Sequence, residues 1–205
     1  MLQSILKVKI FLEGNNMKNI FLFLTSIIIC FNICFADDND KGEKPMGEKT
    51  LIVYYSWGGN TKVVAKKIND IVKGTIFEIE LKVPYTTDYK EVVEQAKKEI
   101  QNGVRPELKE NFSGDLSKYD TIFIGSPNWW GTVAPVIMTF IEKNNLEGKT
   151  IIPFITHGSG GRQNTISDLE KALPKSTFKE ALILNGSLVN KSDDEIKTWL
   201  NKLGY

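Results

Sequence analysis

The chain has very few residues of the kinds that bind metals or form disulfides. It contains two cysteines, Cys30 and Cys34, and a single histidine, His157. Both cysteines lie in one apolar segment near the N-terminus. If that segment is removed, the remaining chain can form no disulfide and can use no thiolate to bind a metal. One histidine cannot build a histidine-rich metal site, so we expect no metal centre.

An excess of charge of either sign is also missing. Lysine and arginine number 26 and aspartate and glutamate 25, which gives a net charge of +1. Proteins that bind nucleic acid or anionic membrane surfaces usually concentrate basic residues. We therefore expect no nucleic-acid partner and no strong attraction to an anionic membrane.

The longest apolar run is near the N-terminus and has the features of a secretory signal. Residues 20–35 are almost wholly apolar, too short for a comfortable membrane span but long enough for the core of a signal peptide. Lys18 precedes the run, and Cys34-Phe35-Ala36 after it resembles a small-x-small cleavage site. Met17 is the natural start by this interpretation. The alternative is a signal that is retained as an anchor.

These features predict three parts of the chain. They are a signal peptide over residues 1–36, a flexible polar linker over 37–48 and a folded domain over 49–205. We expect the protein to be exported to the periplasm or the extracellular space, with no stable membrane insertion after cleavage.

Within residues 49–205, short apolar runs typical of strands alternate with amphipathic helical patterns. The expected strands are Leu51–Tyr55, Ile76–Leu81, Thr121–Gly125, Thr150–Thr156 and Ala181–Leu184. A helical pattern follows each of them. This alternation predicts an α/β fold: an open five-stranded parallel sheet with helices on both faces, in three layers. The alternating pattern of Ile76–Leu81 indicates an edge strand.

Several single residues predict local detail. We expect Gly74 to close the first helix, Pro135 to start the third, and Ser192 with Glu195 to form a capping box for the last. Pro153 has no N–H for a sheet hydrogen bond, so a bulge or an unpaired position is expected there.

In such sheets a ligand binds beyond the carboxyl ends of the strands, where the strand order reverses. Three loops at those ends have unusual compositions: Ser56–Thr61, Gly125–Thr132 and Thr156–Gly161. The first joins a strand to a helix N-terminus, which favours an anion. The second has two indoles, and the third has glycines that allow close approach. Together they suit a ligand with a phosphate at one end and a flat ring at the other.

These residues resemble the flavodoxin family. The resemblance covers about residue 49 to the C-terminus and depends on four segments: Tyr55–Thr61, Pro84–Tyr89, Gly125–Thr132 and Pro153–Gly158. It implies the strand order 2-1-3-4-5 and FMN as the cofactor, bound at the switch point. Trp57 and Gly58 depart from the family pattern, which often has small or hydroxyl residues there. The strongly acidic surface usual in the family is also absent.

Carried over residue by residue, the resemblance implies an FMN site made by the three loops. The phosphate would be held by Ser56, Gly58, Gly59, Asn60 and Thr61. Trp57 would either cover this phosphate loop or face solvent. The ring would be flanked by Pro127, Asn128, Trp129, Trp130 and Gly131, and closed in by Thr156, His157, Gly158, Ser159 and Gly161.

The expected function is electron transfer or reduction of a small acceptor, with donor and acceptor open. Two alternatives remain: an NAD(P)H-dependent FMN oxidoreductase similar to quinone reductases, and a flavin-binding module without turnover. A hydrolase is disfavoured, because Ser159 has His157 rather than glycine two positions before it.

Overall fold

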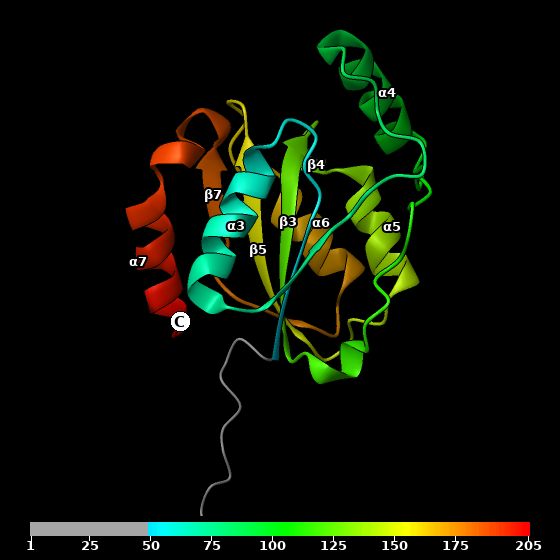
Figure 1. Ribbon diagram of the computed structural model, residues 1–205. Helices are drawn as coiled ribbons and strands as arrows, with labels where there is room; N and C mark the ends of the chain where they lie inside the picture. The colour runs from blue at the N-terminus through cyan, green and yellow to red at the C-terminus, as the bar shows by residue number, and fades with distance from the viewer. Residues whose placement is uncertain (1–48) are drawn as a thin grey trace, which may run out of the picture. The chain divides into compact units, whose positions relative to one another are not determined.

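A computed structural model of the chain describes residues 49–205 (Figure 1). The predicted signal peptide and linker lie outside the described residues. The elements, in chain order, are β1 (Thr50–Tyr54), α3 (Asn60–Val72), β2 (Thr75–Glu78), α4 (Tyr89–Gln101), η2 (Leu116–Lys118), β3 (Thr121–Trp129), β4 (Thr132–Val133), α5 (Pro135–Lys143), β5 (Thr150–His157), α6 (Thr165–Ala172), β6 (Thr177–Phe178), β7 (Leu182–Asn185), η3 (Gly186–Lys191) and α7 (Asp193–Leu203).

The strands form one sheet in the order β2-β1-β3-β5-β6, with β7 also beside β5. Every pairing along this order is parallel, and only the short β4 runs antiparallel, to β3. The α/β class and the edge position of β2 are confirmed. The expected five strands are wrong in detail, because β4 is added and the fifth position is divided between β6 and β7.

The divided fifth strand explains how Pro153 fits inside β5. Pro153 is in continuous register with Ile124 of β3, so there is no bulge on that side. On the other side, β6 pairs with Thr150 and Ile151 and β7 pairs from Phe154 onward. The N–H of Lys179 donates to the Ile151 carbonyl. The backbone N–H and C=O groups of the odd-numbered residues of β5 therefore point to this side of the strand. The missing donor of Pro153 therefore faces the interval between β6 and β7, and the expected unpaired position is confirmed.

Helices cover both faces of the sheet (Figure 1). Side chains alternate along β1, so Val53 belongs to one hydrophobic cluster while Ile52 and Tyr54 belong to the other. The first cluster is completed by apolar residues of α5 and α6, and the second by α3 and α7. The three-layer arrangement predicted from the sequence is confirmed.

Two predicted helix ends are wrong. The residue in the left-handed region after α3 is Lys73, with φ 58°, rather than Gly74. A Cβ at Gly74 would lie 2.6 Å from the Thr50 carbonyl oxygen, so close packing against β1 requires glycine there. Ser192 precedes α7, but its hydroxyl donates to the Val189 carbonyl instead of capping the helix. Pro135 does begin α5, as predicted.

The helix α4 takes a different place from the others. Only Val92 and Ala96 of its residues are buried. Figure 1 shows α4 beyond the carboxyl end of the sheet, and its Val92 joins the hydrophobic cluster that α5 and α6 complete. Within residues 49–205, no helix has the length and apolar character needed to cross a lipid bilayer.

Candidate functional site

A pocket of about 800 Å³ lies at the carboxyl ends of the parallel strands. All three loops singled out in the sequence contribute to it, which places them together as predicted. The residues that line it are Ser56, Trp57, Gly58, Asn60, Thr61, Tyr89, Val92, Val93, Ala96, Pro127, Asn128, Trp129, Trp130, Gly131, Thr156, His157, Gly158, Ser159, Gly160, Gln163, Asn185, Gly186 and Ser187. Of the residues named from the sequence, Gly59 and Gly161 are not among them.

The first loop ends β1 and opens α3 with a glycine N-cap. Gly59 has φ 86°, a conformation that glycine adopts without strain, and it has no side chain to accept from the helix. The N–H groups of Asn60 and Thr61 can therefore bind an anion, aided by the positive end of the helix dipole. A Cβ at Gly58 would meet no atom within 4 Å, so this side of the loop is open.

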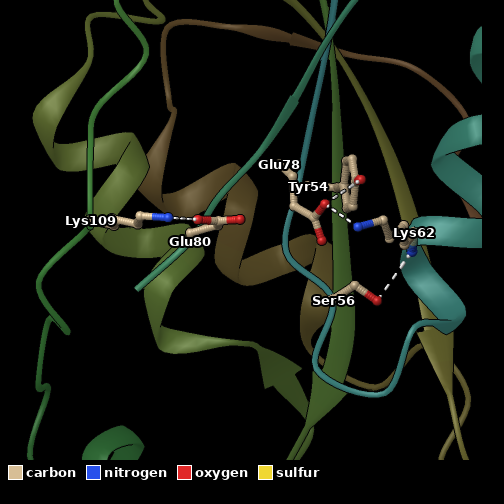
Figure 2. Close-up of polar contacts among 6 residues, drawn as sticks. All are labelled: Tyr54, Ser56, Lys62, Glu78, Glu80 and Lys109. Carbon is tan, nitrogen blue, oxygen red and sulfur yellow. Dashed lines mark hydrogen bonds and ion pairs between the residues drawn. The ribbon is translucent and has the colours of Figure 1, made fainter. Parts of the chain in front are cut away.

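Polar contacts behind this loop fix the first turn of α3 (Figure 2). The Lys62 N–H donates to Ser56 Oγ at 3.2 Å, and Lys62 Nζ donates to Glu78 Oε2 at 2.6 Å. The Tyr54 hydroxyl donates to the same carboxylate oxygen at 3.1 Å, and burial, with Glu78 beside it, raises the pKa of this phenol. The ammonium of Lys62 is thus paired at the end of β2 and does not line the pocket.

The second loop is a tight hairpin that the sequence analysis missed. Trp129 pairs with Thr132, so only Trp130 and Gly131 turn the chain. Their φ angles are 52° and 87°, which is the two-residue turn that suits the twist of paired strands. Asn128 Oδ1 accepts from the Gly131 N–H at 3.0 Å. The glycine at the second turn position was the available signal, but a tryptophan at the first turn position hid it.

The two indoles of this loop have different surroundings. Trp129 packs edge-on against Tyr55 and Tyr85, with ring centroids 5.8 and 5.1 Å away. Trp130 is 53% exposed, and its Nε1 donates to the Val93 carbonyl of α4 at 2.9 Å. Burial raises the pKa of the Tyr55 and Tyr85 phenols. Glu99, which accepts a short hydrogen bond from Tyr85, raises both pKa values further. Trp129 is thus held by packing against the two tyrosines, and Trp130 is held by a hydrogen bond to α4.

The third loop is joined to the first and to the second. The hydroxyls of Thr61 and Thr156 lie 2.8 Å apart and are both buried. Asn128 Nδ2 donates to the Gly161 carbonyl at 2.7 Å, which explains how Gly161 shapes the site without lining it. Nδ1 of His157 is buried and has no hydrogen-bond partner among residues 49–205.

A fourth loop, residues 185–187, was missed in the sequence. It follows β7, and Asn185 Nδ2 donates to the Gly158 carbonyl at 2.8 Å. A Cβ at Gly186 would lie 2.5 Å from Asn60 Nδ2, so glycine lets this loop approach the start of α3. The signal was available, because Asn-Gly-Ser directly follows a predicted strand at the same edge of the sheet.

The helix α4 was also missed as part of the site. Four of its residues line the pocket: Tyr89, Val92, Val93 and Ala96. The sequence showed the amphipathic pattern of this helix but not what its apolar face contacts. Crossover helices normally pack on the sheet, so a pocket was not expected there.

None of the pocket-lining residues, all within the described part of the chain, is an aspartate, glutamate, lysine or arginine. An anion here meets N–H and hydroxyl groups rather than a counter-charge. The arrangement can hold a ligand with one small anionic group and one flat apolar body.

The chain belongs to the flavodoxin family, whose model matches residues 49–203. It is similar to a protein from Bacteroides uniformis ATCC 8492 assigned as a flavoprotein, with 35% identity and a TM-score of 0.67 over 76% of this chain and 99% of that one. A similarly assigned protein from Bacteroides eggerthii DSM 20697 is 32% identical, with a TM-score of 0.67 over 77% of this chain and 98% of that one. A flavoprotein from Lactobacillus acidophilus NCFM, crystallised with FMN, is 29% identical, with a TM-score of 0.59 over 74% of this chain and 98% of that one.

Proposed function

We propose that this chain binds FMN in the pocket and uses it for electron transfer or for the reduction of a small acceptor. The observation that carries the proposal is the convergence of four strand-end loops on one pocket, with helix N-terminal amides on one loop and indoles on another. Membership of the flavodoxin family and the FMN complex of a similar flavoprotein support the same cofactor.

The phosphate would be held by the loop from Ser56 to Thr61. Gly58 opens the loop toward the ligand, and the amides of Asn60 and Thr61 donate to the anion. In the hydroxyl pair of Thr61 and Thr156, 2.8 Å apart, one hydroxyl donates to the other, so the second O–H can donate to a phosphate oxygen. A dianion held by several N–H and O–H donors needs no basic side chain.

The flat ring would lie against the hairpin that ends β3. Trp129 is fixed by Tyr55 and Tyr85, so its indole needs little ordering when a ring packs on it. The loop 156–160 would face the polar edge of the ring. His157 Nδ1, buried without a partner among the described residues, fits a site that a ligand completes. Bound FMN would supply one- and two-electron chemistry, while the protein orients it and limits water.

The test is the visible absorption of the full chain purified from a flavin-replete host, followed by titration of stripped protein with FMN and with riboflavin. We expect a yellow protein that binds FMN at least about 10-fold more tightly than riboflavin, because the phosphate site contributes more than about 1.4 kcal/mol. A protein that stays colourless with excess FMN contradicts the proposal. Equal affinity for the two flavins contradicts the phosphate site.

The alternative functions differ in turnover. Oxidation of NAD(P)H by the FMN-loaded protein would indicate a dehydrogenase-type enzyme. FMN binding without electron exchange with any donor would indicate a module. We favour electron transfer because the FMN phosphate takes the donors of the first loop in this proposal, and the pocket lining, within residues 49–205, offers no basic side chain for the pyrophosphate of a second, dinucleotide ligand.

We also propose that the protein is exported after removal of residues 1–36. The apolar run and the small-x-small sequence before Asp37 support this. Mass spectrometry of the protein from its native envelope would find Asp37 as the first residue. An N-terminus at Met1 or Met17 would contradict cleavage at this position.

A further inference from the structure

Two tryptophans that line the pocket bind the backbone of α4 and of the residues just before it. Trp57 Nε1, from the loop that ends β1, donates to the Thr86 carbonyl at 2.9 Å. Trp130 Nε1, from the hairpin that joins β3 and β4, donates to the Val93 carbonyl at 2.9 Å. Both indoles belong to loops that help to form the pocket. We call these two hydrogen bonds the indole latches.

The C-terminal half of α4 is attached more firmly than the N-terminal half. Glu99 accepts a short hydrogen bond from the hydroxyl of Tyr85, and Tyr85 itself is buried. Arg105, which follows the helix, donates to Glu142 of α5 at 2.6 Å. At the other end of the helix, Tyr89 is 69% exposed. Movement of α4 therefore pivots about its C-terminal half, and its N-terminal half leaves the pocket.

Opening of α4 exposes the side chains of only two buried residues. These are Val92 and Ala96, among the 13 residues of the helix, and both line the pocket. Lys97 lies 4.9 Å from the centre of the Trp130 ring, and such a contact is weak at an exposed site. A closed position that depends on a few modest contacts coexists with a small open population. The indole latches therefore set a large part of the balance between the two positions.

The other walls of the pocket are strand-end loops that are joined to one another. The hydroxyls of Thr61 and Thr156 lie 2.8 Å apart, and Asn128 Nδ2 donates to the Gly161 carbonyl at 2.7 Å. These loops follow strands in the middle of a parallel sheet, which fixes their ends. The helix α4 has no such support, so it is the wall of the pocket that moves most easily.

We propose that α4 is a lid on the flavin site and that Trp57 and Trp130 are positioning residues that hold it closed. The inference rests on the proposed function and names how the site is regulated, because the lid opens for FMN to enter and to leave. A lid held by contacts that do not involve the ligand slows both events by the same factor. Loss of one latch therefore speeds both, whereas loss of a direct contact with the flavin speeds dissociation alone.

The test is Trp57→Phe, which keeps an aromatic ring near Tyr89 but removes the N–H that donates to Thr86. Stopped-flow mixing of the stripped full chain with FMN gives the association rate constant, and dilution of the loaded protein gives the dissociation rate constant, both from flavin fluorescence. We expect each to rise about 5-fold, which is about 1 kcal/mol, the usual contribution of one hydrogen bond. An increase in dissociation alone, or no change in either, would overturn the proposal.

Trp130→Phe removes the second latch at a position that is 53% exposed. It should also raise both rate constants, and it replaces Trp57→Phe if that variant does not fold. An unchanged association rate constant in Trp130→Phe would contradict a latch at this position.

Trp199→Phe is the matched control. Trp199 Nε1 donates to the Glu180 carbonyl at 2.9 Å, so the same kind of hydrogen bond is lost. The described helix α7, to which Trp199 belongs, contributes no residue to the pocket. This variant should leave both rate constants unchanged. If it raises them as much as Trp57→Phe does, a general loss of stability explains the effect and the proposal is overturned.

Amide hydrogen exchange of the stripped protein separates this inference from the proposed function, because it needs no flavin. A single helix of 13 residues is marginally stable in water, so α4 exchanges when it leaves the pocket. We expect Trp57→Phe to speed exchange in residues 89–101 about 5-fold and Trp199→Phe to leave it unchanged. If the wild-type chain binds no FMN, the proposed function fails, and exchange still decides whether the latches hold α4. Unchanged exchange in Trp57→Phe would overturn the lid.

Discussion

Trp130 combines a costly backbone conformation with a position in the pocket. Its φ of 52° lies in the left-handed region, which costs a non-glycine residue about 1–2 kcal/mol. The indole offsets part of this cost, because Nε1 donates to the Val93 carbonyl and Lys97 lies over the ring. Strained residues persist where the surroundings hold them, often at sites of function. We interpret Trp130 as a residue kept for the ligand rather than for stability.

This interpretation predicts opposite effects of Trp130→Asn on stability and on binding. Asparagine suits this turn position, so relief of strain should offset the lost indole contacts. We expect the free energy of unfolding to change by less than about 1 kcal/mol while FMN affinity falls about 10-fold. Urea unfolding of stripped protein and FMN titration measure the two quantities. A loss of stability above about 2 kcal/mol, or an unchanged FMN affinity, would contradict it.

Tyr85 predicts how stability depends on alkaline pH. Burial, the hydrogen bond to Glu99 and its charge raise the pKa of Tyr85 above its ordinary value of about 10. The folded state therefore keeps a proton that the unfolded state loses, so this contribution is complete below about pH 10 and is lost as the pH rises above it. Tyr85→Phe removes the group that titrates.

For Tyr85→Phe we expect a loss of about 1 kcal/mol at pH 7, from the missing hydrogen bond, and a shallower fall in stability between about pH 10 and 11. Glu99 still accepts from Gln95 Nε2 at 2.8 Å, which limits the loss at neutral pH. Urea unfolding at pH 7, 9, 10 and 11 provides the comparison. Parallel pH profiles for wild type and variant would show that Tyr85 does not contribute.

At the scale of elements, α4 is the part of the site with the weakest attachment. Its N-cap, Asp88, accepts from the N–H groups of Lys90 and Glu91 at 2.8 and 3.0 Å. Asp88→Ala should cost the helix about 1 kcal/mol. Because α4 buries only two residues, this should increase amide hydrogen exchange in α4 more than it lowers global stability. We also expect FMN binding in the pocket that α4 lines to weaken several-fold.

Asp115→Ala is the matched control for this variant. Asp115 caps η2, with Oδ1 accepting from the Ser117 N–H at 3.0 Å, and η2 contributes no residue to the pocket. Its loss should leave ligand binding and exchange in α4 unchanged. If both variants weaken binding equally, α4 is not the element through which Asp88 acts.

The sequence predicts the elements that have long, regular patterns. The continuous apolar runs of β1, β3 and β5 identify buried parallel strands, since both faces of each are covered. The sequence shows that Pro153 lacks a donor, but it does not show which neighbouring strand faces that position, so the division of the fifth strand into β6 and β7 could not be predicted. The place of α4 was equally hidden, since its apolar pattern does not say whether a sheet or a pocket faces it.

The candidate site was predicted to a similar extent. Loops such as Ser56–Thr61 follow from the general rule for strand ends, and that rule brings the three loops together. Asn185, Gly186 and Ser187 obey the same rule and could have been included. Contacts such as Asn128 Nδ2 with the Gly161 carbonyl join loops far apart in sequence, and no local pattern announces them.

At the scale of the whole molecule, charges are balanced and the pocket is uncharged. The net charge is +1, and the ion pairs near the site, such as Lys62 with Glu78, join neighbouring elements. Long-range attraction of an anion is therefore weak, and binding depends on short-range donors. Salt screens charges that are separated by more than the Debye length, which falls from about 10 Å at 0.1 M to about 3 Å at 1 M.

We therefore expect FMN affinity to change by less than about 2-fold between 0.1 M and 1 M sodium chloride, because amide and hydroxyl donors contact the phosphate directly. Ser187→Lys is the informative comparison, because it adds one cation to the pocket lining. That variant should bind FMN more tightly at low salt and lose the advantage at 1 M. If wild-type affinity falls more than about 5-fold, then charged side chains outside the lining act on the phosphate, and the uncharged pocket does not explain its recognition.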